Sequence, residues 1–474
     1  MDRKRLSLLA AIMGSFVAGL DATVVNVALP AIDRDLGGGL AGQQWVSNAY
    51  LLTLGSLILI GGSLGDLFGE RRIFSLGVGG FGAASLLCAV APSVELLVAG
   101  RAVQGVFGAL LTPSALAVTI AAYPPAERGG AIGSWTAWSG ISFVIGPLAG
   151  GVIVDATSWR WIFLVNVPFV LVTLFVVAAA VEARPRGGAR PHVDIVGAVL
   201  CALGLGGPVY GLTRQPEAGW GAPEVLLPLA AGAALFAAFL AWERRSRDPM
   251  LPLVLFARRN FAVGNVQTVA MYGGLSMNIF VVVLFLQQVA GYSAVQSGLA
   301  TMPTTVVMFL LSKRMGALAD RLGPRLFMGG GPLIAAAGLL LYLRTSSDAP
   351  YLSEVFPPML VFSLGLSMTV APLTATVLAD ADDSNAGIAS GINNALARMA
   401  GLLAVAAIGI IVAGAITEAS FHRVMAISAG LVALGGLLGL AGIVNPRREV
   451  ECTGCPGGAL HAAPERLGRD KVAI

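Results

Sequence analysis

Charged residues are scarce in this chain, and their scarcity limits the classes of protein to which it can belong. Only 12% of the 474 residues are Asp, Glu, Lys or Arg, whereas about a quarter is usual for a soluble domain. Hydrophobic residues make up 56%, and the mean hydropathy is +0.81. A soluble protein of this composition could not cover its own surface with polar groups. The chain is therefore predicted to be an all-α polytopic membrane protein.

Side chains that metal centres and enzymes require are also rare. The chain has only 4 cysteines and 3 histidines. Cys88 and Cys201 fall in apolar runs, and Cys452 and Cys455 have only His461 nearby, whereas a zinc site needs about four ligands. No Walker motif and no nucleophile–base pair stands out in the sequence. We therefore predict no metal, no cofactor, no use of ATP and no enzymatic activity.

Long apolar runs take the place of the missing charges. A helix needs roughly 20 mostly apolar residues to cross a bilayer. The sequence contains 14 such runs, and the first is predicted to be a retained helix and not a cleaved signal peptide. The predicted spans are 6–28, 45–64, 73–91, 95–120, 131–154, 161–181, 194–212, 224–242, 262–286, 298–317, 325–344, 355–378, 388–414 and 425–444.

The few basic residues are distributed unevenly along the chain. Nucleic-acid binding is one interpretation of the net charge of +4, but the basic residues lie in short clusters between apolar runs. With the N-terminus in the cytoplasm, 23 of the 30 Lys and Arg residues fall in cytoplasmic segments and 5 in external ones. Cytoplasmic loops of membrane proteins carry such an excess. We therefore expect both termini in the cytoplasm and no nucleic-acid partner.

Two predicted cytoplasmic loops share the spacing G-x-L-x-D-x-x-G-x-R, 254 residues apart. Such self-similarity indicates an internal repeat, and repeated halves are one known plan of transporters. The acidic and basic positions are predicted to contribute to gating, or the arginines serve only as topology signals. The residues are Gly62, Asp66, Gly69 and Arg71 in the first copy, and Gly316, Asp320, Gly323 and Arg325 in the second.

The distance between the two copies predicts the domain organisation. The copies are eight predicted spans apart, whereas two six-helix halves alone would separate them by six. Two additional helices therefore lie between two six-helix bundles. The predicted divisions are 1–181 for the first bundle, 182–260 for a linker with the two added helices, 261–444 for the second bundle and 445–474 for a disordered cytoplasmic tail.

Asp21 is an acid deep inside the first apolar run. At 1.5 Å per residue it lies about 22 Å from the inner face of the membrane. An ionised carboxylate at this depth is costly and usually marks a path for ions or protons. Burial disfavours its ionised form, whereas a nearby cation favours it. Proton coupling is the favoured interpretation, and a static ion pair is the alternative.

Arg101 is the natural partner of Asp21. It lies about seven residues into the fourth run, which places it roughly 20 Å from the inner face, at the depth of Asp21. We expect protonation of Asp21 to weaken this pair and allow a change of state. Gln104 lies one helical turn from Arg101 and completes the expected network. A static polar bridge between helices is again the alternative.

A second intramembrane cation, Arg398, lies in the thirteenth run. Asn394 is four residues before it and shares its helical face, and Asn393 is adjacent. A cation at this depth should face a cavity or a partner. We assign these residues, together with Asn26 of the first run, to a substrate cavity. A structural pair is the alternative for Arg398.

Several segments resemble the major facilitator superfamily, and more narrowly its 14-helix drug–proton antiporter group. The doubled loop pattern is similar to the signature of the superfamily. LDATVVNVALP at 20–30 resembles the first-helix motif of the group, and RAVQGVFG at 101–108 resembles its motif tied to proton coupling. WRWIFLVNVP at 159–168 is also similar to this group. The resemblance covers nearly the whole chain.

GISFVIGPLAGG at 140–151 resembles the antiporter motif that is typical of exporters. Its glycines allow close helix packing, and its proline breaks one backbone hydrogen bond. The segment is predicted to be a bendable, tightly packed interface, with an ordinary kinked helix as the alternative. The residues assigned to it are Gly140, Gly146, Pro147, Gly150 and Gly151.

The resemblance implies a proton-coupled antiporter that exports drugs, antibiotics or metabolites across the cytoplasmic membrane by alternating access. Its partners would be a small-molecule substrate, protons and the lipid bilayer, and we expect a monomer. The second half of the chain has no clear mid-membrane carboxylate, which favours neutral, monocationic or anionic substrates. A non-transporting membrane sensor or scaffold, and an uptake or lipid-like substrate transporter of the same fold, remain alternatives.

Overall fold

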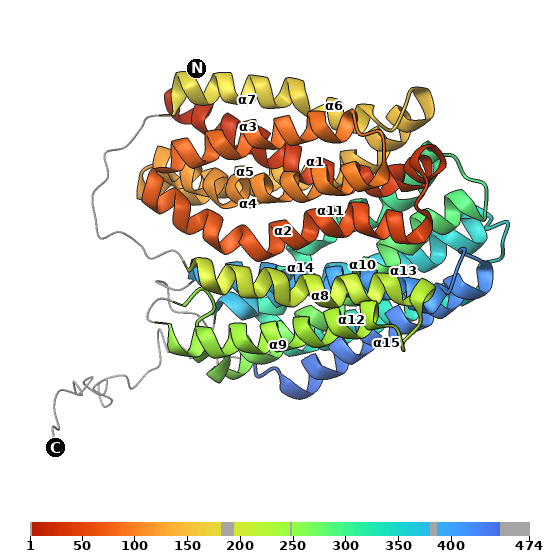
Figure 1. Cartoon of the computed structure of the whole chain (residues 1–474). Helices are drawn as coiled ribbons and strands as arrows, with labels where there is room; N and C mark the ends of the chain where they lie inside the picture. The colour runs from red at the N-terminus through yellow and green to blue at the C-terminus, as the bar shows by residue number, and fades with distance from the viewer. Residues whose placement is uncertain (1, 182–193, 247–248, 380–385, 446–474) are drawn as a thin grey trace, which may run out of the picture. The chain divides into compact units, whose positions relative to one another are not determined.

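Long helices that run side by side build the structure of this chain (Figure 1). The computed structural model describes residues 2–181, 194–246, 249–379 and 386–445. The helices are α1 (Arg3–Leu36), α2 (Gly39–Phe68), α3 (Glu70–Ala89), α4 (Val94–Ala122), α5 (Pro125–Ala156), α6 (Trp161–Leu164), α7 (Asn166–Ala180), α8 (Ile195–Ala218), α9 (Pro223–Arg245), α10 (Arg259–Gln288), α11 (Ala294–Leu322), α12 (Pro324–Leu341), α13 (Phe356–Ala379), α14 (Ala386–Val412) and α15 (Glu418–Gly442).

Within the described residues, 12 helices are long and apolar enough to cross a membrane. Each of them overlaps a predicted span, and the sixth predicted span corresponds to α6 and α7 together. Helices α2 and α5, of 30 and 32 residues, are of similar length but are not among the 12. The prediction of a membrane protein is confirmed, and the count of 14 spans stays a prediction.

The helices extend beyond the apolar runs that predicted them. Helix α1 has 34 residues, whereas the first predicted span was 6–28. Hydropathy detects only the part that matches the hydrocarbon, while backbone hydrogen bonding continues past it. Helix α15 starts at Glu418, seven residues before the predicted 425, because Thr417 and Ser420 form a capping box there.

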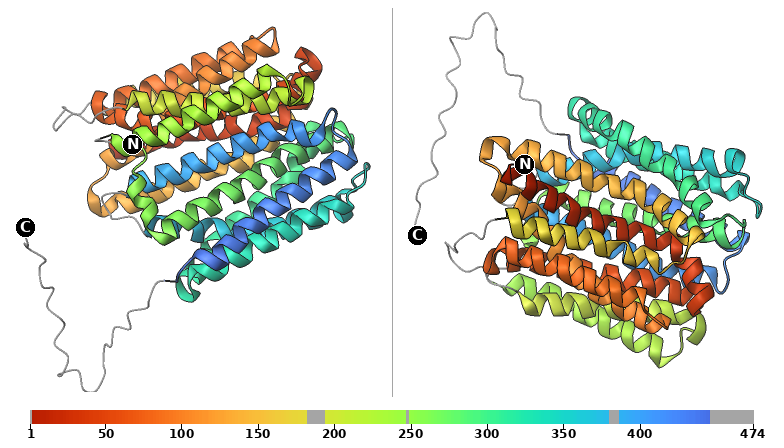
Figure 2. Two further views of the ribbon diagram at one scale, coloured as in Figure 1. Left: turned by 60° about the horizontal axis from the view of Figure 1, so that its bottom comes forward. Right: turned by 90° about the horizontal axis from the view of Figure 1, so that it is seen from above.

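The helices pack in two groups and an added pair. In the N-terminal group (α1–α7), α1 packs on α4, α5 and α7, and α4 packs on α2 and α3. In the C-terminal group (α10–α15), α10 packs on α14 and α15, and α13 packs on α11 and α12. Contacts between α5 and α11 and between α2 and α14 join the groups, which lie beside each other in Figure 2. Helix α8 packs on both α2 and α14, and α9 packs on α8.

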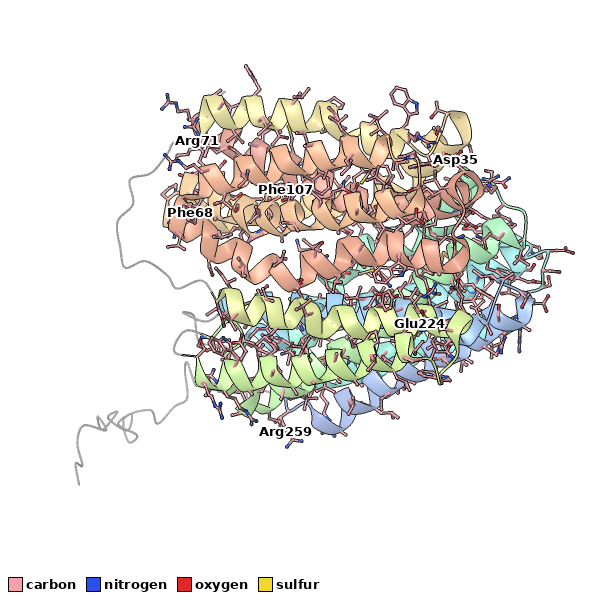
Figure 3. All side chains as sticks on the ribbon, viewed as in Figure 1. Asp35, Phe68, Arg71, Phe107, Glu224 and Arg259 are labelled. Carbon is pink, nitrogen blue, oxygen red and sulfur yellow. The ribbon has the colours of Figure 1, made fainter. Side chains whose placement is uncertain are left out.

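The two ends of the bundle can be told apart by labelled residues in Figure 3. Arg71 and Phe68 lie at the end where α1 begins, which we call the Arg71 end. Asp35 and Glu224 lie at the opposite end, which we call the Asp35 end. The last residues of α1 and the first residues of α2 therefore lie at the Asp35 end. Residues of α10, α11 and α14 that contact them lie at the same end.

The two copies of the repeated loop have the same backbone conformation. Gly69 has φ 93° and ψ 134°, and Gly323 has φ 93° and ψ 143°. Each glycine ends one helix and precedes the first residue of the next. Arg71 donates to the carbonyl of Ala178 in α7, and Arg325 donates to the carbonyl of Leu440 in α15. Each arginine thus holds the loop to the last helix of its own group.

Replacing Gly69 or Gly323 with alanine is expected to lower the free energy of unfolding by about 1–3 kcal/mol, because L-residues rarely adopt this positive φ. Heating the purified protein in detergent while following intrinsic fluorescence measures the change. Gly130→Ala is the matched control, since a Cβ at helical Gly130 meets nothing within 4 Å. Equal stability of all three variants would contradict the expected strain.

Candidate functional site

Asp21 lies at the centre of a buried polar network in the N-terminal group. Its carboxylate accepts hydrogen bonds from Arg101 Nη1 at 2.5 Å, Gln104 Nε2 at 2.9 Å and Asn166 Nδ2 at 3.1 Å. These donors come from α4 and α7, so three helices converge on one acid of α1. Asp21 is 1% exposed and Arg101 2%. The structure therefore brings together the three residues predicted for proton coupling.

The guanidinium group of Arg101 is fixed from several sides. It donates to the side-chain oxygen of Gln104 at 2.6 Å and to the backbone carbonyl of Val46 at 3.2 Å. Its Cζ lies 4.3 Å from the ring centroid of Tyr50, a cation–π contact. Removing one partner of a buried ion pair leaves the other charge uncompensated. Protonation of Asp21 would remove the charge that balances Arg101 within a network held by five helices, α1 to α4 and α7.

Asn166, Ser85 and Tyr50 belong to this network but were not predicted for it. Ser85 Oγ accepts hydrogen bonds from Gln104 at 2.9 Å and from Asn166 at 3.3 Å. All three side chains are buried. An asparagine within the apolar 159–168 segment was a usable signal for Asn166. Serine and tyrosine are common in apolar helices, so nothing marked Ser85 and Tyr50.

The residues predicted for a substrate cavity are dispersed over two helices. Asn26 of α1 accepts a hydrogen bond from Ser47 of α2 at 3.4 Å. Asn393 donates to Asn265 and Thr268 of α10, at 3.1 and 2.7 Å, within the C-terminal group. The other two predicted residues, Asn394 and Arg398, lie on α14. Asn394 is exposed and donates to the carbonyl of Ser390.

The residues assigned to the antiporter motif pack α5 against both groups. A Cβ at Gly146 would lie 1.9 Å from Thr23 Oγ1, and one at Gly150 2.7 Å from Val24 Cγ2, both on α1. A Cβ at Gly151 would lie 2.6 Å from the carbonyl oxygen of Ala294 on α11. Only glycine permits these approaches. Gly140 lies in α5, but its surroundings are outside what the structure describes.

The facing helix α11 contributes a glycine of its own to this contact. A Cβ at Gly298 would lie 2.3 Å from the backbone carbonyl oxygen of Pro147. The carboxylate of Asp155, at the end of α5, accepts the backbone N–H groups of Ala294 at 3.1 Å and Val295 at 2.8 Å. A carboxylate at a helix N-terminus is stabilising. Helices α5 and α11 are therefore held together at the Asp35 end.

Two glutamines make further hydrogen bonds between the groups at the same end. Gln44 of α2 donates to the carbonyl of Val405 in α14 at 2.6 Å. Gln287 of α10 donates to the carbonyl of Val27 in α1 at 2.9 Å. Each group thus supplies one donor and one acceptor helix. We call Gln44, Gln287 and Asp155 the latch residues.

A cavity of about 940 Å³ opens beside the latch residues. Its wall includes all three latch residues, charged side chains of α1, and the end of the added helix α8 at Thr213 and Glu217. Ligand cavities of proteins measure about 300–1,000 Å³. The volume would admit a small organic molecule, and α8 supplies part of the wall.

The remaining predicted residues lie in helices and not in loops as predicted: Gly62 and Asp66 are in the last turns of α2, and Gly316 and Asp320 are in the last turns of α11. A Cβ at Gly62 would face Pro113 of α4 at 3.8 Å, and one at Gly316 would face Ala371 of α13 at 3.6 Å, so the copies occupy matching places. Asp320 is exposed. The side chain of Asp66 lies outside what the structure describes.

Comparisons with known proteins agree over most of the chain. A family model described as Major Facilitator Superfamily matches residues 11–405. The puromycin resistance protein pur8 of Streptomyces alboniger is 36% identical over 421 residues, covering 87% of this chain and 82% of that protein. The tetracenomycin C resistance and export protein of Streptomyces glaucescens is 34% identical over 414 residues, with coverages of 87% and 76%.

Solved structures share the fold at low sequence identity. A D-xylose–proton symporter superposes with a TM-score of 0.67 at 15% identity, over 92% of this chain and 97% of that chain. The inward-open xylose transporter from E. coli gives a TM-score of 0.64 at 14% identity, over 93% and 97%. At these identities the likeness concerns the arrangement of helices alone.

Proposed function

This chain belongs to the major facilitator superfamily of transporters, and we propose that it exports small organic molecules in exchange for protons. The observation that carries the proposal is the buried Asp21, which has one cationic and two amide donors around it. Ionisable residues inside membranes usually serve ion or proton paths. Relatives named for puromycin resistance and for tetracenomycin C resistance and export support an antibiotic-like substrate and an outward direction.

We propose that the Arg71 end faces the cytoplasm and the Asp35 end faces outward across the cell membrane. The excess of Lys and Arg in the loops of the Arg71 end supports this orientation. In this orientation the latch residues would close the external side, which supports an inward-facing assignment for this conformation. Gly130 and Gly133, near the cytoplasmic start of α5, face open space, as expected where the groups separate.

The proposed cycle uses the two helix groups as moving bodies, with 14 membrane-spanning helices in total. Substrate enters from the cytoplasmic side while Asp21 is ionised and paired with Arg101. The latch then opens outward and the substrate leaves. An external proton neutralises Asp21, and the weakened pair allows the latch to close again. Asp21 then releases this proton to the cytoplasm and pairs with Arg101 once more. Differential affinity of protons and substrate for the two states supplies the coupling.

Everted membrane vesicles test this function directly. With the vesicle lumen acidified, transported compounds added outside should release luminal protons and restore the fluorescence of a pH-sensitive dye. Vesicles lacking the protein, and vesicles carrying a variant without the titrating acid, provide the baselines. If no compound from a broad antibiotic and dye panel dissipates the gradient, proton-coupled export by this chain is refuted.

The double substitution Gln44→Leu/Gln287→Leu is expected to favour external opening by about tenfold or more, because each intramolecular hydrogen bond contributes about 0.5–1.5 kcal/mol. The labelling rate of a cysteine placed at Val27, which is 1% exposed, with an impermeant maleimide measures the change. Gln288→Leu is the matched control, since this exposed neighbour makes only a 3.5 Å contact with Gln43. An unchanged labelling rate in the double variant would show that these glutamines do not hold the external side closed.

A further inference from the structure

Arg398 lies where the two helix groups meet near the middle of the membrane. It is 12 residues into α14, or about 18 Å from the cytoplasmic start of that helix at 1.5 Å per residue. A Cβ at Gly55 of α2 would lie 3.5 Å from the Cβ of Arg398. The side chain therefore starts at the seam between α14 of the C-terminal group and α2 of the N-terminal group.

Arg398 lacks the compensation that Arg101 receives. Its Nε is buried and has no hydrogen-bond partner, and no ion pair among the described residues includes it. The titratable groups that interact with it electrostatically are the phenols of Tyr50 on α2 and Tyr272 on α10, which are neutral at physiological pH. The membrane acid Asp21 is engaged by Arg101. In the C-terminal group the sequence offers no clear mid-membrane carboxylate.

An uncompensated cation at this depth is costly, so such charges are kept where they meet a partner during function. We propose that Arg398 binds an anionic group of the transported molecule, so that the substrates of this transporter are organic acids. A guanidinium matches the geometry of a carboxylate through two parallel hydrogen bonds. The inference deepens the proposed export function and rests on it. A structural pair would require a carboxylate partner, and none of the ion pairs within the described residues involves Arg398.

Tyr50 connects the anion site to the proton site. Its ring lies under the guanidinium of Arg101, at 4.3 Å, and its phenol also interacts electrostatically with Arg398. Movement of Arg101 after protonation of Asp21 would therefore displace a group beside Arg398. An anion that leaves the cell and a proton that enters it both make the interior more positive, so each exchange moves net positive charge inward. A membrane potential that is negative inside should then drive transport, whereas exchange of one monocation for one proton moves no net charge.

The stability of the substrate-free protein tests the role of Arg398 without knowledge of the substrate. Arg398→Gln and Arg398→Met are expected to unfold at the same or a higher temperature than the wild type, because a half-buried charge without a counter-ion is removed. Arg101→Gln is the matched control and is expected to unfold at a lower temperature, because it breaks a paired charge. If the Arg398 variants are destabilised as much as Arg101→Gln, the residue is a structural pair and the proposal is overturned.

Transport of matched compounds tests the substrate class. The probes are aromatic carboxylic acids, the methyl ester of each acid, and aromatic amines of similar size, added to everted vesicles and to the purified protein. We expect the acids to release protons and to bind about tenfold or more tightly than their esters, as measured by thermal stabilisation of the purified protein, since a charged hydrogen bond contributes about 1.5–3 kcal/mol. Arg398→Gln should remove this difference in affinity. A lumen-positive potential imposed on the everted vesicles with potassium and valinomycin should accelerate transport of the acids into the lumen.

Each outcome separates the two proposals. Acids that bind but move no protons would refute antiport and support anion recognition. Amines or esters that move protons as well as the acids, or acids that Arg398→Gln still transports at the wild-type rate, would support antiport and overturn anion recognition. If no member of the panel binds or moves protons, both proposals are refuted.

Discussion

Asp21→Asn is expected to reduce substrate-driven proton flux by about 100-fold or more, because the group that takes up and releases the proton is gone. Asparagine has nearly the same shape, and its side-chain oxygen can still accept a hydrogen bond from Arg101 or Gln104. The substitution should therefore reduce proton flux much more than it reduces the affinity for substrate. The flux assay in everted vesicles, together with binding of the same substrate to the purified protein, separates the two effects.

The same substitution leaves Arg101 buried without its counter-ion, which costs about 3–5 kcal/mol when a buried pair loses one member. A fall in proton flux could then reflect unfolding. The double variant Asp21→Asn/Arg101→Gln removes both charges and is expected to recover most of the stability while remaining uncoupled. Asp33→Asn is the control on the same helix, because this carboxylate caps Gly39 outside the network. Full proton flux in Asp21→Asn would assign coupling to another residue.

The apolar runs predicted most of the helices because lipid forces each spanning segment to satisfy its own backbone hydrogen bonds. The repeated pattern could also be recognised from the sequence, since Gly69 and Gly323 occupy a positive φ that few other residues tolerate. Depth along two helices was sufficient to pair Asp21 with Arg101. Asp and Arg are rare in apolar spans, so an acid and a cation at one depth could be paired from the sequence alone.

The latch residues and the network members Ser85 and Tyr50 could not be predicted in the same way. Gln44 and Gln287 are 243 positions apart, and each donates to a backbone carbonyl, which carries no mark in the sequence. Their role depends on which helices of the two groups meet, and this arises from packing across the whole bundle. The missing counter-ion of Arg398 was likewise visible only after its surroundings had been placed.

Gly151→Leu is expected to prevent closure of the external side and to reduce transport by about 100-fold. Its Cβ would lie 2.6 Å from both the carbonyl oxygen of Ala294 and the Cα of Val295, which are backbone atoms that cannot move aside alone. Overpacking costs typically about 1–3 kcal/mol, and about 1.4 kcal/mol changes a population tenfold. The inward-facing state should therefore become rare, while outward-facing states, in which α5 and α11 separate, remain accessible.

Gly430→Leu is the matched control for this prediction, because it makes the same change on an exposed helical glycine of α15, within the C-terminal group, where a Cβ meets nothing within 4 Å. An impermeant maleimide applied to intact cells should label a cysteine at Val27 about 10–100-fold faster in Gly151→Leu than in Gly430→Leu, in proportion to the shifted population. Val27 packs against Val283 and Ala294 at the closed side, so its labelling reports the separation of the groups. Equal labelling with retained transport would mean that α5 and α11 need not approach in the cycle, and the motif at 140–151 would then be an ordinary kinked helix.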